Sequence, residues 1–363
     1  MRGIHHFVPV MHRGDAIGRH TLRLRNATRA RGFESHIYVD VTEEETARET
    51  IPVLEYPASA QPGDVAVYQF ATASYMAPWL AGRGETLVVN YHNITPPDLL
   101  APWDNHLALG QLRAQADLRL LAPRTALAVS DSAYNEAHLI EAGFAATAVI
   151  PPSAALGHDV IAVGIDAQVP ARETPRGARW LAVGRVAPNK ALQDTIAALA
   201  VTRAHDDPEA TLLVIGKPAT ALYDRALHRY VDELGLHGAV TFAGHASDAV
   251  VAAAYAQADV LVITSEHEGF CVPAVEAMSV GLPVVAFGQG ALPEVLGDAG
   301  TFVTSKDPYA LSNTIDALLA DAPRRASVTQ AGRHRLDSLD LASAAERFVA
   351  LLVALVESGG RRR

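Results

Sequence analysis

The feature that most constrains the fold is a regular alternation of short apolar runs with longer helical stretches along the whole chain. The short runs are rich in β-branched and aromatic residues, which favours strands. Strands that alternate with helices are typical of a parallel sheet with helical crossover connections. In the first half, we predict strands at residues 4–10, 35–40, 65–70, 86–90 and 125–129, and a helix at about 19–31.

The alternation restarts after a segment of different composition. Residues 157–179 are rich in Gly, Pro and charge, which is typical of a linker. A chain of 363 residues is also too long for one ordinary core. We therefore predict two α/β domains, residues 1–172 and 173–341. The strands expected in the second domain are residues 179–183, 212–215, 240–245, 258–264 and 301–304, with another that opens after Pro283. A further strand of the first domain is expected to end before Pro151.

Charge and cysteine content limit the partners and the compartment. The formal net charge is −10, so a nucleic-acid partner, which calls for a basic surface, is not expected. Cys271 is the one cysteine of the sequence, so no intramolecular disulfide can form and a reducing compartment fits. No secretory signal and no apolar run long enough to cross a bilayer is visible. These observations predict a cytoplasmic protein.

Residues 265–285 join a predicted strand to a helix and carry two carboxylates. Gly269 breaks the strand pattern just after Glu268, and Pro273 suits the first turn of a helix. Glu276 then lies one turn into that helix. Because the first backbone N–H groups of a helix lack intrahelical partners, this helix start predicts an anion site. A ligand with phosphate and many hydroxyls would suit it.

A second loop in this half brings two cations close together. Arg185 and Lys190 lie in the sequence GRVAPNK, which joins the strand at 179–183 to a helix. Arg can hold two phosphate oxygens at once, and Lys supplies a point charge. The pair therefore predicts a clamp for a diphosphate. Gly216, at the end of the following strand, is a further candidate for the same ligand.

These motifs resemble a known family. Glu268 and Glu276, in EGFCVPAVEAM, resemble the E-x7-E motif of the retaining glycosyltransferases of family 4, and GRVAPNK resembles that family's G-R-x-x-x-x-K element. The resemblance covers nearly the whole chain. It implies the GT-B fold, in which two Rossmann-like parallel-sheet domains face each other across a cleft. It also implies transfer of a sugar from a nucleoside diphosphate sugar, held mainly by the second domain, to an acceptor hydroxyl.

The resemblance assigns roles to single residues of the second domain. Arg185 and Lys190 are expected to hold the departing diphosphate, Glu268 the hydroxyls of the donor sugar, and Glu276 the ribose. Backbone N–H groups of four consecutive residues are expected to complete the donor site: Gly269, Phe270, Cys271 and Val272. Cys271 departs from the family, which commonly has glycine there, and its side chain narrows the space beside the donor sugar. In relatives the C-terminal helix, here about residues 342–358, packs back on the first domain.

Loops of the first domain are expected to contribute as well. In the resembled family a histidine at the position of His92 faces the donor sugar, although an ordinary loop histidine is the alternative. Gly14 is carried over as a contact to the donor phosphates and Asp15 as a contact to the acceptor. A simple glycine turn would give the same pattern at this loop. Ser130, which also follows a strand, is another candidate on the acceptor side.

No cofactor and no metal are expected. The sequence contains no D-x-D pair to bind a metal ion, and Arg185 and Lys190 supply the positive charge instead. The helix at residues 19–31 carries five arginines and few acids. It could contact anionic lipid at the inner membrane face, or it could be an ordinary solvated face. The donor nucleoside, the sugar, the acceptor (glycan, glycolipid precursor or small metabolite) and the oligomeric state stay open.

Three other functions share parts of the pattern. A glycoside hydrolase could use Glu268 and Glu276 as acid and nucleophile, with carboxyl groups about 5–5.5 Å apart for retention, but it has no use for a phosphate clamp. A nucleotide-sugar epimerase on the same fold would act without an acceptor. A non-catalytic subunit that binds a sugar nucleotide would activate a partner. Acceptor-dependent release of nucleoside diphosphate separates all three from a transferase.

Overall fold

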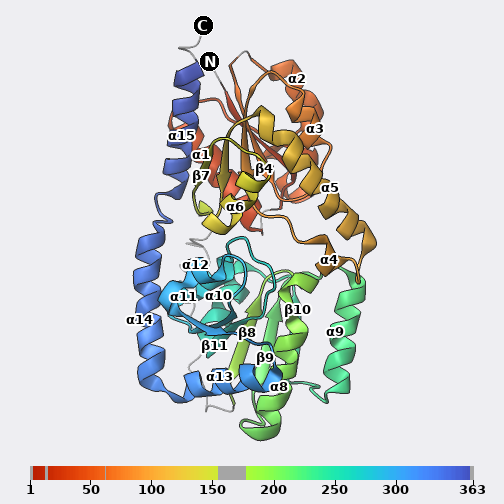
Figure 1. Cartoon of the computed structure of the whole chain (residues 1–363), viewed down its shortest axis with the longest axis vertical. Helices are drawn as coiled ribbons and strands as arrows, with labels where there is room; N and C mark the ends of the chain where they lie inside the picture. The colour runs from red at the N-terminus through yellow and green to blue at the C-terminus, as the bar shows by residue number, and fades with distance from the viewer. Residues whose placement is uncertain (1–2, 13–14, 62, 154–176, 360–363) are drawn as a thin grey trace. The chain divides into compact units, whose positions relative to one another are not determined.

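The computed structural model of the chain describes residues 3–12, 15–61, 63–153 and 177–359, which form two compact units (Figure 1). Unit 1 comprises residues 1–97, 107–155 and 340–363, and unit 2 comprises residues 98–106 and 156–339. The domain boundary that the sequence predicts near residue 172 lies outside the described residues. The sequence places residues 98–106 in the first domain, but they group with unit 2. Trp103 packs there against Tyr223, with ring centroids 4.9 Å apart.

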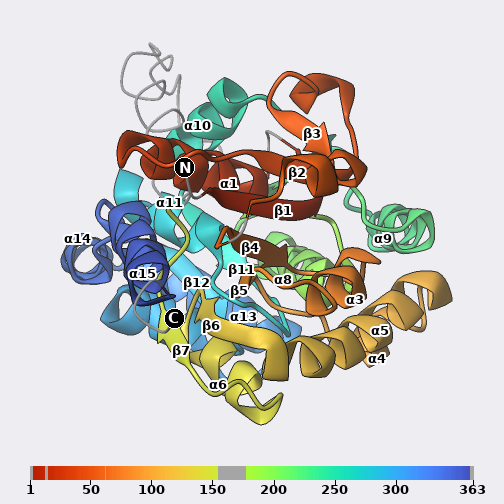
Figure 2. The same cartoon turned by 90° about the horizontal axis from the view of Figure 1, so that it is seen from above.

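Unit 1 is built on a seven-stranded parallel sheet. Figure 2 shows its strands in succession: β3 (Thr50–Pro52), β2 (Ile37–Val41), β1 (Ile4–Val10), β4 (Val65–Phe70), β5 (Thr86–Tyr91), β6 (Thr125–Ser130) and β7 (Thr147–Val149). The chain moves outward from β1 on one side and from β4 on the other, which is the plan of a doubly wound α/β domain. The point where the strand order reverses therefore lies between β1 and β4.

Helices cover both faces of this sheet: α1 (Ala16–Ala30), α2 (Tyr56–Ser59), α3 (Met76–Ala81), α5 (Asn105–Leu121), α6 (Ala133–Glu141) and α15 (Ala344–Gly359), with 3-10 turns at Glu44–Thr46, Val53–Glu55 and Ala122–Arg124. The short helix α4 (Pro97–Leu100) falls, after Pro97, in the segment that groups with unit 2. Neighbouring residues of a strand point to opposite faces, so β4 contributes to two cores. Val65 and Val67 pack with Leu24 of α1 and Phe348 of α15. Tyr68 packs on the other face with residues of α3, α5 and α6. The C-terminal helix thus packs on unit 1.

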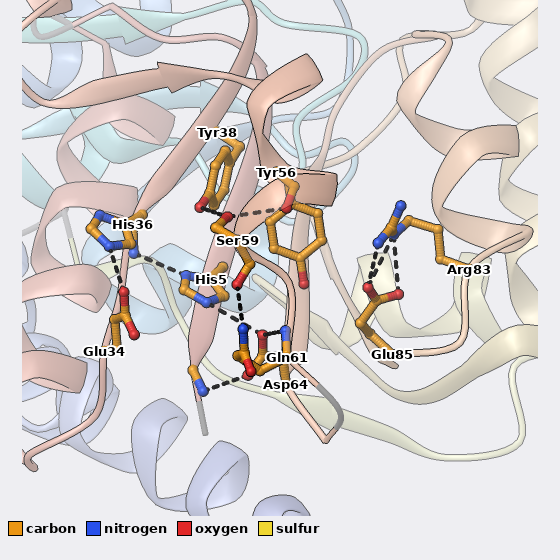
Figure 3. A network of polar contacts seen from close by, with 11 residues as sticks. His5, Glu34, His36, Tyr38, Tyr56, Ser59, Gln61, Asp64, Arg83 and Glu85 are labelled. Carbon is orange, nitrogen blue, oxygen red and sulfur yellow. Dashed lines mark hydrogen bonds and ion pairs between the residues drawn. The ribbon is translucent and has the colours of Figure 1, made fainter. Parts of the chain in front are cut away.

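The amino ends of β1, β2 and β4 are tied together by a polar network, which Figure 3 shows. The Asp64 carboxylate accepts hydrogen bonds from the backbone N–H groups of Gly3 at 2.6 Å and Gln61 at 2.7 Å. His5 stacks on His36 with ring centroids 5.6 Å apart. Burial lowers the pKa of His5 despite the nearby Asp64 carboxylate, so the ring is neutral at neutral pH. This network therefore lies at the amino ends of the strands, whereas ligands of parallel sheets bind at the carboxyl ends.

Unit 2 is built on a six-stranded parallel sheet in the order β10 (Val240–Gly244), β9 (Thr211–Ile215), β8 (Arg179–Val183), β11 (Val260–Ile263), β12 (Val284–Phe287) and β13 (Gly300–Val303). Its helices are α8 (Leu192–His205), α9 (Ala221–Glu233), α10 (Asp248–Gln257), α11 (Val272–Val280), α12 (Leu292–Leu296), α13 (Pro308–Ala320) and α14 (Ala322–Leu339), with 3-10 turns at Pro188–Lys190 and Gly297–Ala299. Buried side chains of α8, α9 and α13 form one core with the sheet. Here the strand order reverses between β8 and β11.

Each predicted strand agrees with the structure to within two residues at either end. β3, a short edge strand, was not predicted, because its three residues carry no period-two pattern and end in proline. α1 begins at Ala16, three residues before the predicted start. The Asp15 carboxylate accepts a hydrogen bond from the Gly18 N–H at 2.6 Å and so caps the helix. Gly18 therefore belongs to the helix and not to the loop before it.

Candidate functional site

A pocket of unit 2 opens at the carboxyl ends of β8 and β11. These strands are neighbours in the sheet but not in the sequence, and ligands of open α/β sheets bind at such a reversal of strand order. The pocket is lined by loop residues that follow the two strands, among them Gly184, Arg185, Lys190, Ser265, Glu268 and Cys271. The structure therefore brings the predicted phosphate clamp and the predicted glutamate loop into the same pocket.

An ion pair connects the two loops. Lys190 Nζ donates to Glu268 Oε1 at 2.5 Å, and Ser265 Oγ donates to the same oxygen at 2.7 Å. Burial by itself lowers the pKa of Lys190, but the Glu268 carboxylate outweighs it and the net shift is upward. Lys190 is therefore a cation at neutral pH. Ser265, which holds the carboxylate from the other side, was missed by the sequence reasoning.

Two glycines let the backbone of these loops come close together. A Cβ atom on Gly216 would lie 1.8 Å from the carbonyl oxygen of Gly184, so no side chain fits there. Gly216 thus keeps the clamp loop in place. Gly290, which follows β12, has φ of 62°, and a Cβ atom on it would lie 2.5 Å from the Glu268 carbonyl oxygen. Gly290 supports the glutamate loop in the same way, and the sequence reasoning did not find it.

The start of α11 has an unusual backbone. Cys271, the residue before the helix, adopts a left-handed conformation with φ of 76° and ψ of 74°. Glycine adopts this conformation without strain, which accounts for the residue that the resembled family prefers here. Burial, together with the negative charge of Glu268, raises the pKa of the Cys271 thiol, so the thiol stays protonated. Val272 is the first residue of α11, and the side chain of Phe270 is buried.

The two glutamates of the motif have different partners. Glu276 lies one turn into α11 and is 5% exposed. The hydroxyl of Tyr255, on α10, donates to Glu276 Oε2 at 2.8 Å. Glu268 is thus held by a lysine and a serine, whereas Glu276 is held by a phenol. No sequence signal points to Tyr255, because the helix that carries it precedes the motif and its partner is set by packing.

In unit 1, His92 belongs to a polar cluster at the carboxyl ends of the strands. Its Nδ1 lies 2.9 Å from Asp131 Oδ2, and its Nε2 lies 2.8 Å from Gln69 Oε1. Asn90 Nδ2 donates to the same Gln69 oxygen at 2.8 Å and lies 2.9 Å from His20 Nε2. With only 4% of its side chain exposed, His92 is held in one orientation. The sequence reasoning singled out His92 but missed these partners.

His20 ends this chain of hydrogen bonds. Its Nδ1 lies 2.9 Å from Ser153 Oγ, and the ring is 1% exposed. Burial first, and the neighbouring His92 and His6 second, lower the pKa of His20 well below its ordinary value. The ring is therefore neutral. Since its partners come from distant parts of the sequence, no local pattern could predict this cluster.

The other candidates of unit 1 are one loop glycine and two residues that are already hydrogen-bonded. Gly14 lies outside the described residues. The Asp15 carboxylate caps α1, and burial raises its pKa although His92 acts in the opposite direction. Ser130 is fully buried, and its hydroxyl donates to the carbonyl of Ser132 at 3.1 Å. A contact of Asp15 or Ser130 with an acceptor stays a prediction.

The arginines of α1 make contacts within unit 1. Arg23 donates to the carbonyl of Ser153, and Arg29 donates to the carbonyl of Ser35 at 2.8 Å. Arg31 forms an ion pair with Glu346 of α15 at 2.8 Å. In the part of the chain that the structure describes, no helix has the length and apolar character to span a bilayer. Contact of α1 with a membrane surface stays a prediction.

Solved structures show the same architecture over nearly the whole chain. Sucrose-phosphate synthase from Thermosynechococcus elongatus is 20% identical in sequence, with a TM-score of 0.75. The match covers 98% of this chain and 100% of the synthase chain. Alr3699/HepE from Anabaena, in complex with UDP-glucose, is 20% identical with a TM-score of 0.72, and the match covers 96% and 99%. The likeness shows the fold: two Rossmann-like parallel-sheet domains of the GT-B class.

The sequence comparisons cover less of the chain than the comparison of folds. Residues 171–335 match the family model Glycosyl transferases group 1. D-inositol 3-phosphate glycosyltransferase from Stackebrandtia nassauensis is 35% identical over 150 residues, 39% of this chain and 34% of that protein. MMP alpha-(1->4)-mannosyltransferase from Mycolicibacterium hassiacum is 35% identical over 170 residues, 46% and 40% of the two chains. The chain thus spans between a third and two fifths of these curated relatives. The family match thus covers residues 171–335, whereas the likeness in fold covers nearly the whole chain.

Proposed function

We propose that this chain is a glycosyltransferase that moves a sugar from a nucleoside diphosphate sugar to an acceptor hydroxyl, with retention at the anomeric carbon. The match of residues 171–335 to Glycosyl transferases group 1 supports this proposal. The relatives named above, an inositol phosphate glycosyltransferase and a mannosyltransferase, are both named for sugar transfer. Solved structures of the same fold include one in complex with UDP and one with UDP-glucose.

The observation that carries the proposal is the Lys190–Glu268 ion pair beside Arg185, at the reversal of strand order in unit 2. Negative charge grows on the diphosphate as the glycosidic bond breaks. Lys190 and Arg185 supply positive charge that is already in place, and loss of one such group typically costs about 3–4 kcal/mol. In the free protein Glu268 balances Lys190. When the donor binds, its diphosphate becomes the counter-ion, and the carboxylate can accept hydrogen bonds from sugar hydroxyls.

The start of α11 supplies the neutral part of the donor site. The first N–H groups of a helix have no partner four residues back, and the positive end of the helix dipole favours phosphate. We assign the backbone N–H groups of Cys271 and Val272, at the helix start, to phosphate or sugar hydroxyls for this reason. The family resemblance extends the assignment to Gly269 and Phe270. Glu276, further along the same helix, is assigned to the ribose hydroxyls.

His92 is assigned to the donor sugar as a hydrogen-bond partner. Because Asp131 fixes the ring through Nδ1, Nε2 can exchange Gln69 for a sugar hydroxyl without a turn of the imidazole. The leaving phosphate deprotonates the acceptor on the same face of the sugar, so the reaction requires no separate base. Arg185 and Lys190 also take the place of a metal ion, so the proposed reaction is metal-independent.

The rival functions fit these contacts less well. A retaining hydrolase needs two facing carboxylates, whereas Glu268 and Glu276 are held by different partners, Lys190 and Tyr255. An epimerase would use the same donor site without an acceptor. A non-catalytic subunit would bind the nucleotide sugar and release nothing. Turnover that requires an acceptor would exclude both the epimerase and the non-catalytic subunit.

The acceptor is proposed as a class: a hydroxyl on a glycan, a glycolipid precursor or a small metabolite. One relative is named for D-inositol 3-phosphate and another for alpha-(1->4)-mannosyl transfer, and these names favour a small polyol or a sugar as acceptor. A glycolipid precursor would bring the chain to the inner membrane face. Vesicle co-sedimentation with anionic and neutral lipid would test that part alone.

The deciding experiment measures release of nucleoside diphosphate from UDP- and GDP-sugars, with and without a panel of sugar and inositol phosphate acceptors. We expect release that depends on the acceptor, and a product that keeps the anomeric configuration of the donor. Release at the same rate without acceptor would favour hydrolysis. Conversion of the donor sugar without release would favour an epimerase. Binding of the donor with neither reaction would leave the non-catalytic subunit.

A further inference from the structure

We propose that Tyr255 is a positioning residue that orients the Glu276 carboxylate for the ribose of the donor nucleotide. The inference rests on the proposed function, in which Glu276 accepts hydrogen bonds from ribose hydroxyls. Tyr255 lies on α10, outside the sequence motif that contains Glu276. Its role follows from the contacts that its hydroxyl makes.

The Tyr255 hydroxyl reaches α11 at two places. It lies 2.8 Å from Glu276 Oε2 and 3.4 Å from the carbonyl oxygen of Pro273, in the first turn of the helix. The shorter contact is the hydrogen bond that it donates. Tyr255 is 2% exposed and Glu276 is 5% exposed, so water hardly competes for this bond. Hydrogen bonds to an ionised acceptor are roughly twice as strong as those between neutral groups.

A donor on Oε2 restricts the last torsion of the glutamate side chain, which otherwise has a broad preference. A carboxylate has about four acceptor positions, so Glu276 can keep its bond to Tyr255 while both ribose hydroxyls donate to it. The carboxylate plane is therefore set before the nucleotide arrives. Fixing a group in its bound orientation improves affinity because less freedom is lost on binding.

A purely structural role is the alternative. The same hydrogen bond fastens α10 to the first turn of α11, and its loss would loosen the whole donor site. That would weaken every nucleotide alike. A positioning role acts through the ribose hydroxyls, so its loss weakens a ribonucleotide but not an analogue that lacks these hydroxyls. The preference for ribose therefore separates the two.

The experiment measures dissociation constants of UDP and 2′,3′-dideoxy-UDP, or of the GDP pair if UDP does not bind. Four proteins are compared: the unchanged chain, Tyr255→Phe, Glu276→Gln and Tyr223→Phe. Tyr223 is the matched control, because its buried hydroxyl donates to Gln193 at 2.7 Å in the same unit and does not touch Glu276. Thermal unfolding of each variant shows whether it is folded.

We expect Tyr255→Phe to raise the dissociation constant of UDP about tenfold and to leave that of 2′,3′-dideoxy-UDP unchanged. Glu276→Gln should abolish most of the preference, and Tyr223→Phe should keep it. Equal weakening of both nucleotides by Tyr255→Phe would overturn the inference. So would an unchanged preference in Tyr255→Phe while Glu276→Gln loses it, although the proposed function would stand. An unchanged preference in Glu276→Gln would instead remove the ribose assignment and the inference with it.

Discussion

The two units have the same strand order and differ in the side chains at the carboxyl ends of their strands. Each sheet has the order 3-2-1-4-5-6 when the strands are counted within the unit, and unit 1 adds one strand. In unit 2 the loops at the reversal carry full charges, with Lys190 paired to Glu268. In unit 1 the corresponding strand ends carry amides and imidazoles, with Gln69 and Asn90 between His92 and His20, and one carboxylate, Asp131, beside His92. Topology thus decides where a site lies, and the side chains decide which charge it can bind.

Removal of a charge from the loops at the carboxyl ends of the unit 2 strands should have the largest effect on turnover. Lys190→Ala and Glu268→Ala should each lower turnover at least about a hundredfold, because each removes a group that stabilises the transition state. Steady-state kinetics with donor and acceptor measure this effect. Unit 2 offers a matched control in Lys306, whose Nζ donates to Glu266 at 2.6 Å. Lys306→Ala should lower turnover far less, and near-normal turnover in Lys190→Ala would contradict the comparison.

At the carboxyl ends of the unit 1 strands, a substitution should lower turnover less and should hardly change nucleotide affinity. His92→Ala should lower kcat about tenfold to hundredfold, since a hydrogen-bond partner of the sugar is lost. Nucleotide affinity should change little, because the charges that hold the diphosphate stay. His36, at the opposite edge of the sheet (Figure 3), is the control, and His36→Ala should keep full turnover. A larger loss in nucleotide affinity than in kcat would make His92 a nucleotide-binding residue.

Mild acid should separate the units by stability. Burial lowers the pKa of His6 from 6.5 to about 3, and burial also lowers the pKa values of His5 and His20. The unfolded chain binds these protons first, so stability falls as the pH drops below 6.5. For His6 the loss is about 1.4 kcal/mol per pH unit, down to about pH 3. Burial raises the pKa values of carboxyl groups in both units, Asp15 and Asp117 in unit 1 and Asp194 and Asp316 in unit 2, and these shifts change stability with pH in the opposite direction. The buried histidines with lowered pKa values named here all lie in unit 1.

Hydrogen exchange of the full chain at pH 7 and pH 5.5, corrected for the intrinsic rates, measures this difference. Peptides from β1, β4 and β5 should lose protection at the lower pH. Peptides from β8, β9 and β11 serve as the internal control and should keep it. Equal loss in both sets would show that the buried histidines do not set the acid response.

The smallest expected effect concerns metal ions. If Arg185 and Lys190 provide all the positive charge that the diphosphate needs, EDTA should leave turnover nearly unchanged, and added Mg²⁺ should not raise it much. The assay is the same kinetic measurement, after removal of metal by chelating resin. A loss of more than about tenfold that Mg²⁺ restores would show that the unit 2 charges are insufficient by themselves.

The sequence predicts the fold well because the strands depend on local patterns, and the structure brings Arg185, Lys190 and Glu268 into one pocket, whose role as the donor site stays a prediction. Strand positions follow from apolar runs, and the spacing of Glu268 and Glu276 is visible in one short stretch. The cluster around His92 could not be predicted, because Gln69, Asn90 and His20 meet only when three elements pack. Tyr255 could not be predicted for the same reason, because its contact with Glu276 forms only when α10 packs on α11. The start of α1 was misplaced because the N-cap of that helix was not recognised in the sequence.

The most direct test of the central claim is a crystal structure of the chain with UDP bound. The account predicts a diphosphate in contact with Arg185 and Lys190, close to the first turn of α11, with the Lys190–Glu268 distance longer than 2.5 Å. A diphosphate bound elsewhere, with this ion pair intact, would contradict it.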